Sequence, residues 1–149
     1  MNLRPITPKI AIAGQPTEEQ LQELKKSGYV GVINLRNDGE PEQPMTTAAE
    51  GEVVRTLGME YLHRGFGGTP LTSEAVTSVC DFLDRHAEQS VLVHCRSGGR
   101  AAALVLLQQA RAHKWSADEA VSKGKAMGLE VAGGLKMMIE QFLAANPKY

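Results

Sequence analysis

The residues best suited to chemistry in this sequence lie within the segment VLVHCRSGGR, residues 91–100. A short apolar run leads into Cys95, a glycine-rich turn follows, and Arg100 closes the turn after four intervening residues. An alanine- and leucine-rich stretch begins at once. This order is typical of a buried strand, a loop of backbone N–H groups and a helix N-terminus, which together bind anions. The pattern therefore predicts a cysteine nucleophile beside an anion site.

The neighbours of Cys95 favour its thiolate form, which is the reactive form of a thiol. Arg96 and Arg100 are cations close to it in sequence, and His94 lies directly behind it. The helix that begins near Arg100 directs its positive end toward the sulfur. We therefore predict Cys95 and Arg100 as catalytic residues, with His94 in a supporting role.

The turn itself is predicted to bind the anion through Arg96, Ser97, Gly98 and Gly99. The two glycines allow backbone torsions that turn successive N–H groups inward, and the Arg100 guanidinium can hold an oxyanion with two donors. A cysteine after a buried strand is often only a small core residue. The coincidence of cysteine, glycines and arginine at one strand–helix junction favours a functional loop.

The elements that position this loop follow from the apolar pattern. Four apolar segments are predicted strands: residues 9–13, 29–35, 59–63 and 91–94. Helices alternate with them, and capping boxes are predicted at Thr17 with Gln20, at Thr47 with Glu50 and at Ser116 with Glu119. This alternation predicts an α/β fold with a mainly parallel central sheet and helices on both faces. The loops 36–45, 64–71 and 95–100 then meet at the carboxyl ends of the strands, where sites form in such sheets.

Three further residues of these loops are candidates for supporting roles. Arg36, at the end of the strand over residues 29–35, can face the site as an extra cation, although an exposed arginine is the ordinary alternative. His63 and Arg64 flank the predicted pocket and can orient a ligand, with ordinary loop polarity as their alternative. The charged loop over residues 36–45 also contains Asp38.

Bulk composition excludes several functions. The chain has 149 residues, 16 basic and 17 acidic residues and a net charge of −1, which predicts one domain over residues 1–149 and neither a nucleic-acid nor a membrane partner. No segment resembles a signal peptide or a membrane span, so we expect a cytoplasmic protein with reduced thiols. Four histidines and two cysteines show no metal-ligand spacing, so neither a metal nor another cofactor is expected. No oligomeric state is assigned.

The loop resembles two known classes of thiolate enzyme. Cysteine-based phosphatases carry His-Cys-x5-Arg, and rhodanese-type sulfurtransferases carry a loop shorter by one residue, often Cys-Arg-Ser-Gly-x-Arg. Residues 95–100 of this sequence, CRSGGR, match the second. The rest of the chain does not resemble a rhodanese domain.

The segments AIAGQPTEEQLQELKKSGYVGVINLRNDGEP, YLHRGF and VLVHCRSGGR resemble the beta-lactamase-hydrolase-like, or phosphatase-like, domain family (DUF442). The resemblance extends from Ile6 to about Gln108. It implies a dual-specificity-phosphatase-like fold. Some members of the family are described as sulfur transferases and occur fused to persulfide dioxygenases.

Phosphate-ester hydrolysis requires a proton donor for the leaving group, which phosphatases of this fold usually take from an aspartate about thirty residues before the cysteine. Residues 61–68 contain no carboxylate, and position 101 is Ala101 where a hydroxyl is usual. Asp38, Glu40 and Glu42 are the only substitutes. Asp38 is the candidate acid if the protein is a phosphatase, and a solvated charged loop is the ordinary alternative.

Sulfur transfer requires no such acid, because the leaving group is already a stable anion. The sequence therefore ranks first a sulfurtransferase that moves sulfane sulfur through a Cys95 persulfide. The donor is a small anion such as thiosulfate or glutathione persulfide, and the acceptor is a thiol or cyanide. The alternative is a tyrosine- or dual-specificity-type phosphatase with a Cys95 phosphocysteine. A noncatalytic anion-binding module is a third reading, although such modules usually lose the cysteine.

Overall fold

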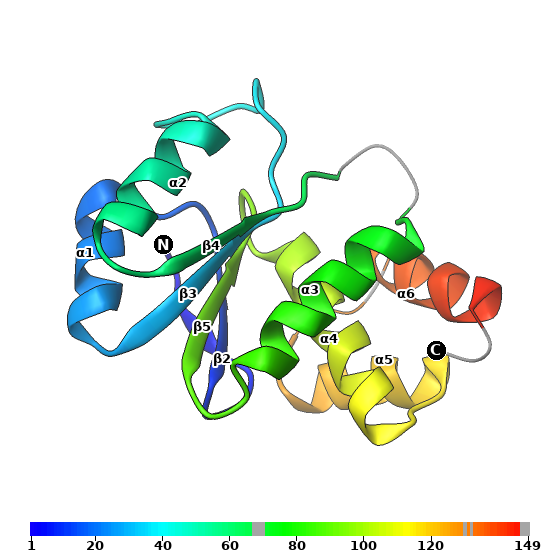
Figure 1. Ribbon diagram of the computed structural model, residues 1–149. Coiled ribbons are helices and arrows are strands. Elements are labelled where there is room, and N and C mark those ends of the chain that lie inside the picture. Colours follow the sequence, from blue (N-terminus) through cyan, green and yellow to red (C-terminus); the bar gives the residue numbers. More distant parts are fainter. Residues whose placement is uncertain (67–70, 130, 132, 147–149) are drawn as a thin grey trace.

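A single five-stranded sheet forms the centre of the computed structural model, which describes residues 1–66, 71–129, 131 and 133–146. The strands are β1 (Arg4–Pro5), β2 (Ile10–Ala13), β3 (Tyr29–Asn34), β4 (Glu60–His63) and β5 (Ser90–His94). Their order is β1-β2-β5-β3-β4 (Figure 1). Strands β2, β5, β3 and β4 are parallel to one another, and β1 pairs with β2 in the antiparallel direction. The predicted α/β class with a mainly parallel sheet is confirmed.

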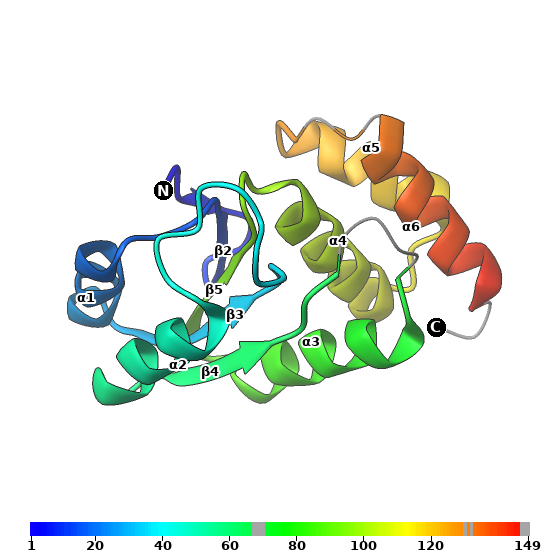
Figure 2. The same cartoon turned by 90° about the horizontal axis from the view of Figure 1, so that it is seen from above.

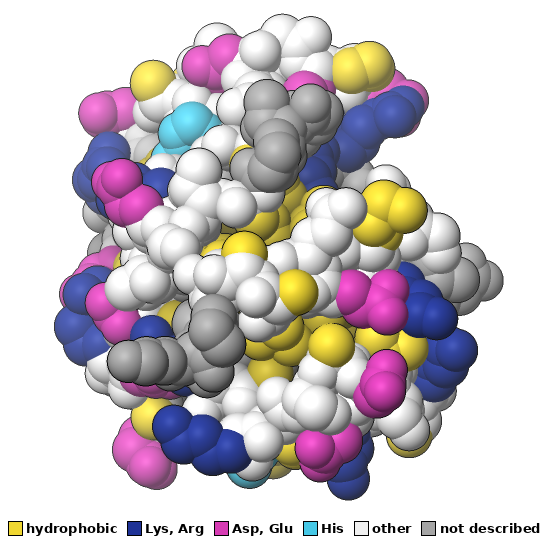
Figure 3. Space-filling model, turned by 90° about the vertical axis from the view of Figure 1, so that its right-hand side faces the viewer, with side chains coloured by type: hydrophobic (Ala, Val, Ile, Leu, Met, Phe, Trp, Pro, Cys, Tyr) yellow, Lys and Arg dark blue, Asp and Glu magenta, His cyan; other side chains and the backbone are white. Residues whose placement is uncertain are grey.

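Six helices are found in the described part of the chain: α1 (Glu18–Lys26), α2 (Thr47–Thr56), α3 (Ser73–Arg85), α4 (Gly99–His113), α5 (Ala117–Ala126) and α6 (Gly133–Ala145). Figures 1 and 2 show α1 and α2 on one face of the sheet and α3 and α4 on the other. Helices α5 and α6 pack against α4 on the outer side. The space-filling view from that side shows apolar side chains in hollows between charged ones (Figure 3).

The two faces of the sheet contribute to two separate cores, because successive side chains of a strand point to opposite faces. In β2, Ile10 and Ile12 face α3 and α4, whereas Ala11 and Ala13 face α1 and α2. This arrangement explains the predicted continuous apolar strands, which are buried on both faces.

Helix starts agree with the sequence except at α2. Thr17 and Ser116 form the predicted capping boxes. At α2 the N-cap is Thr46, whose hydroxyl accepts a hydrogen bond from the Ala49 N–H, so the predicted box on Thr47 is wrong. With the N-cap at Thr46, the position that would complete a capping box is Ala49, and Glu50 lies in the first turn as a buried residue.

The carboxyl ends of β2, β5 and β3 bring their loops together. Gly14 follows β2, and a Cβ atom there would lie 2.7 Å from the Arg96 carbonyl oxygen. Only glycine permits this close approach. Residues 67–70 of the predicted loop 64–71 lie outside the described residues. In the described part of the chain, no helix has the length and apolar character needed to span a membrane.

Candidate active site

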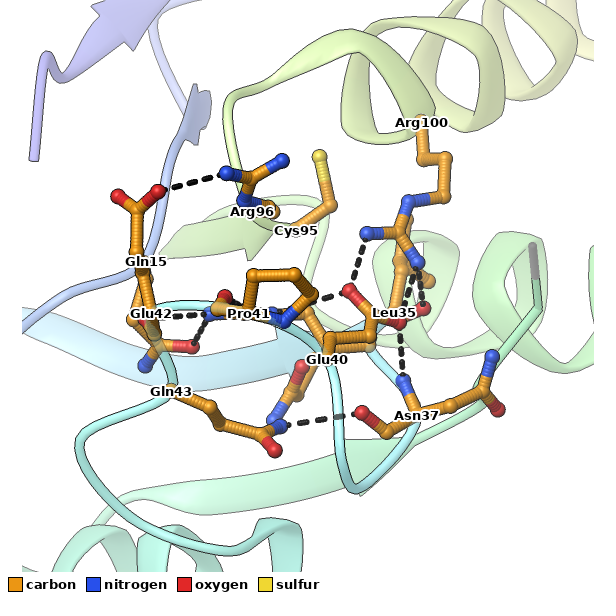
Figure 4. Close-up of polar contacts among 12 residues, drawn as sticks. Gln15, Leu35, Asn37, Glu40, Pro41, Glu42, Gln43, Cys95, Arg96 and Arg100 are labelled. Carbon is orange, nitrogen blue, oxygen red and sulfur yellow. Dashed lines mark hydrogen bonds and ion pairs between the residues drawn. The ribbon is translucent and has the colours of Figure 1, made fainter.

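Cys95 emerges from the end of β5 with its sulfur directed into the following loop. Its own N–H donates to the Ala13 carbonyl, and the Gly98 N–H donates to Sγ at 3.1 Å. The residue is only 1% exposed. Figure 4 shows the sulfur projecting toward the start of α4, with Arg96 on one side and Arg100 on the other. The sulfur therefore faces a main-chain donor and the Arg100 guanidinium, whereas the Arg96 guanidinium is paired with Glu42.

The start of α4 offers main-chain donors to this site. The N-cap residue, Gly98, has a φ of 105° and forms no side-chain capping bond. A positive φ is costly for any residue with a Cβ atom, so glycine is required here. Helix α4 begins at Gly99, in agreement with the start predicted near Arg100. The first amides of a helix have no intrahelical acceptor and bind anions readily.

Arg100 is held beside the sulfur by a carboxylate from the loop that follows β3. Its Nη1 and Nη2 atoms donate to the two oxygens of Glu40 at 2.9 and 2.7 Å. Nη1 also donates to the carbonyl of Phe66 at 2.7 Å and that of Leu35 at 3.2 Å. The hydrogen bonds to Glu40 raise the pKa of Arg100, and the nearby Cys95 acts in the same direction. The guanidinium is thus a permanent cation in a fixed position.

Glu40 is ionised at neutral pH. The hydrogen bonds from Arg100 are the main cause that lowers its pKa from 4.5 to about 2, against the opposing effect of burial. The Asn37 N–H and the Arg36 side chain lower it further. A carboxyl group with this pKa cannot protonate a leaving group near neutral pH, so Glu40 serves to hold the arginine.

Arg36 is fully buried, which excludes the exposed arginine that was its ordinary alternative. Its Nε donates to Glu40 at 3.2 Å, Nη1 to the Gln15 side chain at 2.8 Å and Nη2 to the Pro41 carbonyl at 2.5 Å. The guanidinium therefore orders the loop after β3. It reaches the predicted anion site through Glu40 and Arg100 rather than as an additional direct cation.

Asp38, the candidate acid, lies at the N-terminus of α2 and not above the Cys95 sulfur. Asp38 accepts hydrogen bonds from the Thr47 N–H at 2.7 Å and from the Thr47 hydroxyl at 3.2 Å. It therefore satisfies the N-terminus of α2, where the helix dipole favours a negative charge. Glu42, which is exposed, pairs with Arg96 at 2.6 Å. The loop is thus not merely a solvated charged segment, because its three acidic side chains each have a defined cation or amide partner.

His63 and Arg64 lie at the rim of this loop. The His63 Nε2 atom is 2.6 Å from the Arg36 carbonyl oxygen, so the ring holds the chain where β3 ends. Arg64 is exposed and donates to the His63 carbonyl. The predicted ligand-orienting role of these two residues stays a prediction.

Two polar residues near the site, the buried Glu50 and the half-buried Gln15, were not identified as functional candidates in the sequence, whereas His94 was predicted in a supporting role. His94 and Glu50 lie 2.6 Å apart, and Gln15 donates to Glu50 at 2.8 Å. A sequence signal for Glu50 exists, because Thr47, Glu50 and Val54 share the inward face of α2. Because Glu50 was assigned to a capping box, its burial on this face was not predicted.

A cavity of about 640 Å³ adjoins the loop, lined by Ser97, Gly98 and Gly99 together with apolar side chains such as Leu129. Among the residues that the structure describes, no group of three or more His, Cys, Asp or Glu side chains is placed to hold a metal ion. The arrangement can therefore perform nucleophilic attack by the Cys95 sulfur on an anionic group held by main-chain N–H groups and Arg100.

Comparisons with known proteins agree with this arrangement. Residues 2–112 match the family model described as beta-lactamase hydrolase-like protein, phosphatase-like domain. A beta-lactamase hydrolase-like protein from Xylella fastidiosa is 34% identical over 142 residues, which cover 95% of this chain and 32% of that protein. One from Agrobacterium fabrum is 29% identical over 140 residues, with 93% and 32% covered. The chain thus spans about a third of the length of these relatives.

Solved structures show the same fold. A putative phosphatase (DUF442) from Shewanella putrefaciens superposes with a TM-score of 0.75 at 25% identity and covers 96% of this chain and 91% of its own. Tk-PTP in its active form gives a TM-score of 0.78 at 20% identity, with 97% of each chain covered. The fold is phosphatase-like, and the chain belongs to the family of phosphatase-like domains of beta-lactamase hydrolase-like proteins.

Proposed function

We propose that this protein is a cysteine-dependent phosphatase that forms a phosphocysteine on Cys95. The observation that carries the proposal is the placement of the sulfur, which accepts the Gly98 N–H at 3.1 Å beside the Arg100 guanidinium. The family description and the likeness to the Shewanella putative phosphatase support phosphoryl transfer over the sulfur transfer that the sequence ranks first.

The reaction has two displacements. The Cys95 thiolate attacks phosphorus, an S–P bond forms, and the P–O bond to the leaving group breaks. Main-chain N–H groups and Arg100 bind the oxygens of the transferred group and stabilise their charge. Water then attacks phosphorus, the S–P bond breaks, and inorganic phosphate leaves with the thiolate restored.

The stability of the leaving group determines which phosphate esters we expect to react fastest. Glu40 is ionised, and Asp38 is bound at the N-terminus of α2, so neither supplies a proton to a departing alkoxide. We therefore expect aryl phosphates, whose leaving groups are stable anions, to react much faster than alkyl phosphates. A leaving group that is stable as an anion needs no proton, so such substrates do not require the acid that residues 61–68 do not provide.

The test is a comparison of wild type and Cys95→Ser on p-nitrophenyl phosphate and on a simple alkyl phosphate. Loss of the nucleophile should reduce kcat by about 10⁴-fold or more, as in other covalent catalysts. Mass spectrometry of quenched wild type should find a phosphoryl group on the peptide that contains Cys95. Undiminished turnover by Cys95→Ser would exclude the proposal.

Sulfur transfer is the second candidate, favoured by the four-residue spacing between Cys95 and Arg100 and by the lack of an available acid. The thiolate attacks the outer sulfur of thiosulfate or glutathione persulfide. A new S–S bond forms, sulfite or glutathione thiolate leaves, and Cys95 carries a persulfide. A thiol or cyanide then takes the outer sulfur and restores the thiolate.

The same preparation distinguishes the two reactions. Incubation with thiosulfate, followed by mass spectrometry, detects a persulfide on the Cys95 peptide, and addition of cyanide should yield thiocyanate. Turnover of thiosulfate without any turnover of aryl phosphate would place sulfur transfer first. A Cys95 peptide that gains phosphoryl but no sulfur would remove it.

A further inference from the structure

Glu50 is a buried carboxylate that the proposed reaction does not use. It projects from α2 into the interior and is 1% exposed. Removing a carboxylate from water is costly, and a well-packed apolar side chain is often neutral or more favourable for stability alone. Its contacts therefore need an explanation beyond packing.

One set of contacts leads from Glu50 to the nucleophile. Its Oε2 atom is 2.6 Å from His94 Nε2, and His94 Nδ1 is 3.2 Å from the Cys95 carbonyl oxygen. That carbonyl only accepts, so Nδ1 carries a proton. Nε2 and the carboxyl group share a second proton, whether as imidazolium and carboxylate or as imidazole and carboxylic acid. Either form fixes the ring, and the ring fixes the backbone of Cys95.

A second set of contacts leads from Glu50 to the arginine. Gln15 Nε2 donates to Glu50 Oε1 at 2.8 Å, and Gln15 Oε1 accepts from Arg36 Nη1 at 2.8 Å. Arg36 Nε donates to Glu40 at 3.2 Å, and Glu40 binds Arg100 through both oxygens. Gln15 Nε2 also donates to the Pro16 carbonyl at 3.0 Å, so Glu50 is one of two acceptors that hold the amide with its oxygen toward Arg36.

We propose that Glu50 is a positioning residue that sets both halves of the site, Cys95 through His94 and Arg100 through Gln15, Arg36 and Glu40. It acts by hydrogen bonding and touches no substrate. The inference rests on the proposed function only in taking Cys95 and Arg100 as the reacting pair. In the described part of the chain, no buried side-chain nitrogen or oxygen lacks a partner. Loss of Glu50 would leave His94 Nε2 without its partner and would remove one of the two acceptors of Gln15 Nε2.

The test uses Glu50→Ala, the conservative Glu50→Gln and a control, Val54→Ala. Val54 is fully buried on the same helix but belongs to the apolar core. Tungstate affinity, measured by calorimetry, reports on the anion site without turnover. The rate of Cys95 alkylation by iodoacetamide at pH 7, measured by peptide mapping, reports on the nucleophile.

We expect Glu50→Ala to weaken tungstate binding by about 10-fold or more and to slow alkylation by about 3-fold or more. Glu50→Gln should stay within about 3-fold of wild type in affinity, because its amide can accept from Gln15 and donate to His94. Val54→Ala should melt at a lower temperature than wild type and keep its affinity for tungstate.

If Glu50→Ala does not fold, Gln15→Ala tests the second set of contacts by itself. Gln15 is half-buried, and its removal leaves the His94 contact in place. Tungstate affinity should fall by about 3- to 10-fold, while the alkylation rate stays at the wild-type value.

Three results would overturn the inference. They are wild-type affinity in every folded variant at Glu50 or Gln15, an equal loss of affinity in Val54→Ala, or a Glu50→Gln protein that behaves as Glu50→Ala. Failure of the proposed function has a different signature, in which wild type neither binds tungstate nor hydrolyses aryl phosphates. The alkylation rates of the Glu50 variants then still decide the contact with Cys95.

Discussion

The two loops that form the site are built in different ways. The loop after β5 binds through its own backbone, with Gly98 at a φ of 105° and its N–H on the Cys95 sulfur. The loop after β3 binds Arg100 through side chains, because Glu40 accepts hydrogen bonds from Arg100 and Arg36 holds Glu40. The first is local in sequence, whereas the second joins residues 60 positions apart. The nucleophile is thus held directly by nearby main-chain groups, whereas its arginine is held directly by side chains that are distant in sequence.

Arg100→Lys tests the point where the two loops meet and should have the largest effect. Lysine keeps the charge but cannot hold Glu40 with two parallel bonds while also binding an anion. We expect kcat/KM for aryl phosphate to fall by about 10²- to 10³-fold. Steady-state kinetics with a melting curve as control measure it. A decrease below threefold would mean that the paired geometry is unimportant.

Gly98→Ala tests the backbone loop. A Cβ atom there meets its nearest neighbour at 4.0 Å, so space is sufficient, but the positive φ remains unfavourable. We expect a loss of about 1–2 kcal/mol in stability, measured by urea unfolding, together with slower alkylation of Cys95. An unchanged stability would indicate that the loop readily takes another conformation.

Glu40→Gln tests the side-chain clamp, and its effect depends on pH. The pKa of Glu40 is lowered to about 2, so its stabilisation is complete above about pH 4.5 and is lost as the pH falls through about 2. The variant should therefore be less stable than wild type by about 1–3 kcal/mol at pH 7. The difference should disappear near pH 2. Urea unfolding across this range measures it, and a difference that persists below pH 2 would contradict the pairing.

Asp38→Asn should have the smallest effect. The amide oxygen still accepts from the Thr47 N–H, and the amide NH2 can donate to the Thr47 hydroxyl in place of the bond that Asp38 accepts from it, so the main loss is the favourable interaction of a charge with the α2 N-terminus. We expect about 0.5–1 kcal/mol in stability and no change in kcat. A large loss of kcat, confined to substrates with poor leaving groups, would instead identify Asp38 as the acid.

Much of the fold could be predicted because its signals are local. The strands over residues 10–13 and 90–94 and the capping boxes at Thr17 and Ser116 follow from patterns a few residues long. The short antiparallel β1, Arg4–Pro5, was not predicted, because two residues show no periodicity. At α2, Thr46 and Thr47 are adjacent and either can cap a helix. Because the N-cap was predicted at Thr47, the burial of Glu50 was not predicted.

The sequence by itself determined the nucleophilic loop, since Cys95, the two glycines and Arg100 lie within six residues and backbone geometry there follows from residue type. Only the tertiary structure decided which charges meet. Folding buries Arg36, pairs Glu40 with Arg100 and binds the loop residue Asp38 to the N-terminus of α2 instead of placing it above the sulfur. The physical reason is that hydrogen bonds and ion pairs act over a few ångströms in space. The number of residues between two side chains does not determine the distance between them, because that distance is set when the sheet brings the strand ends together.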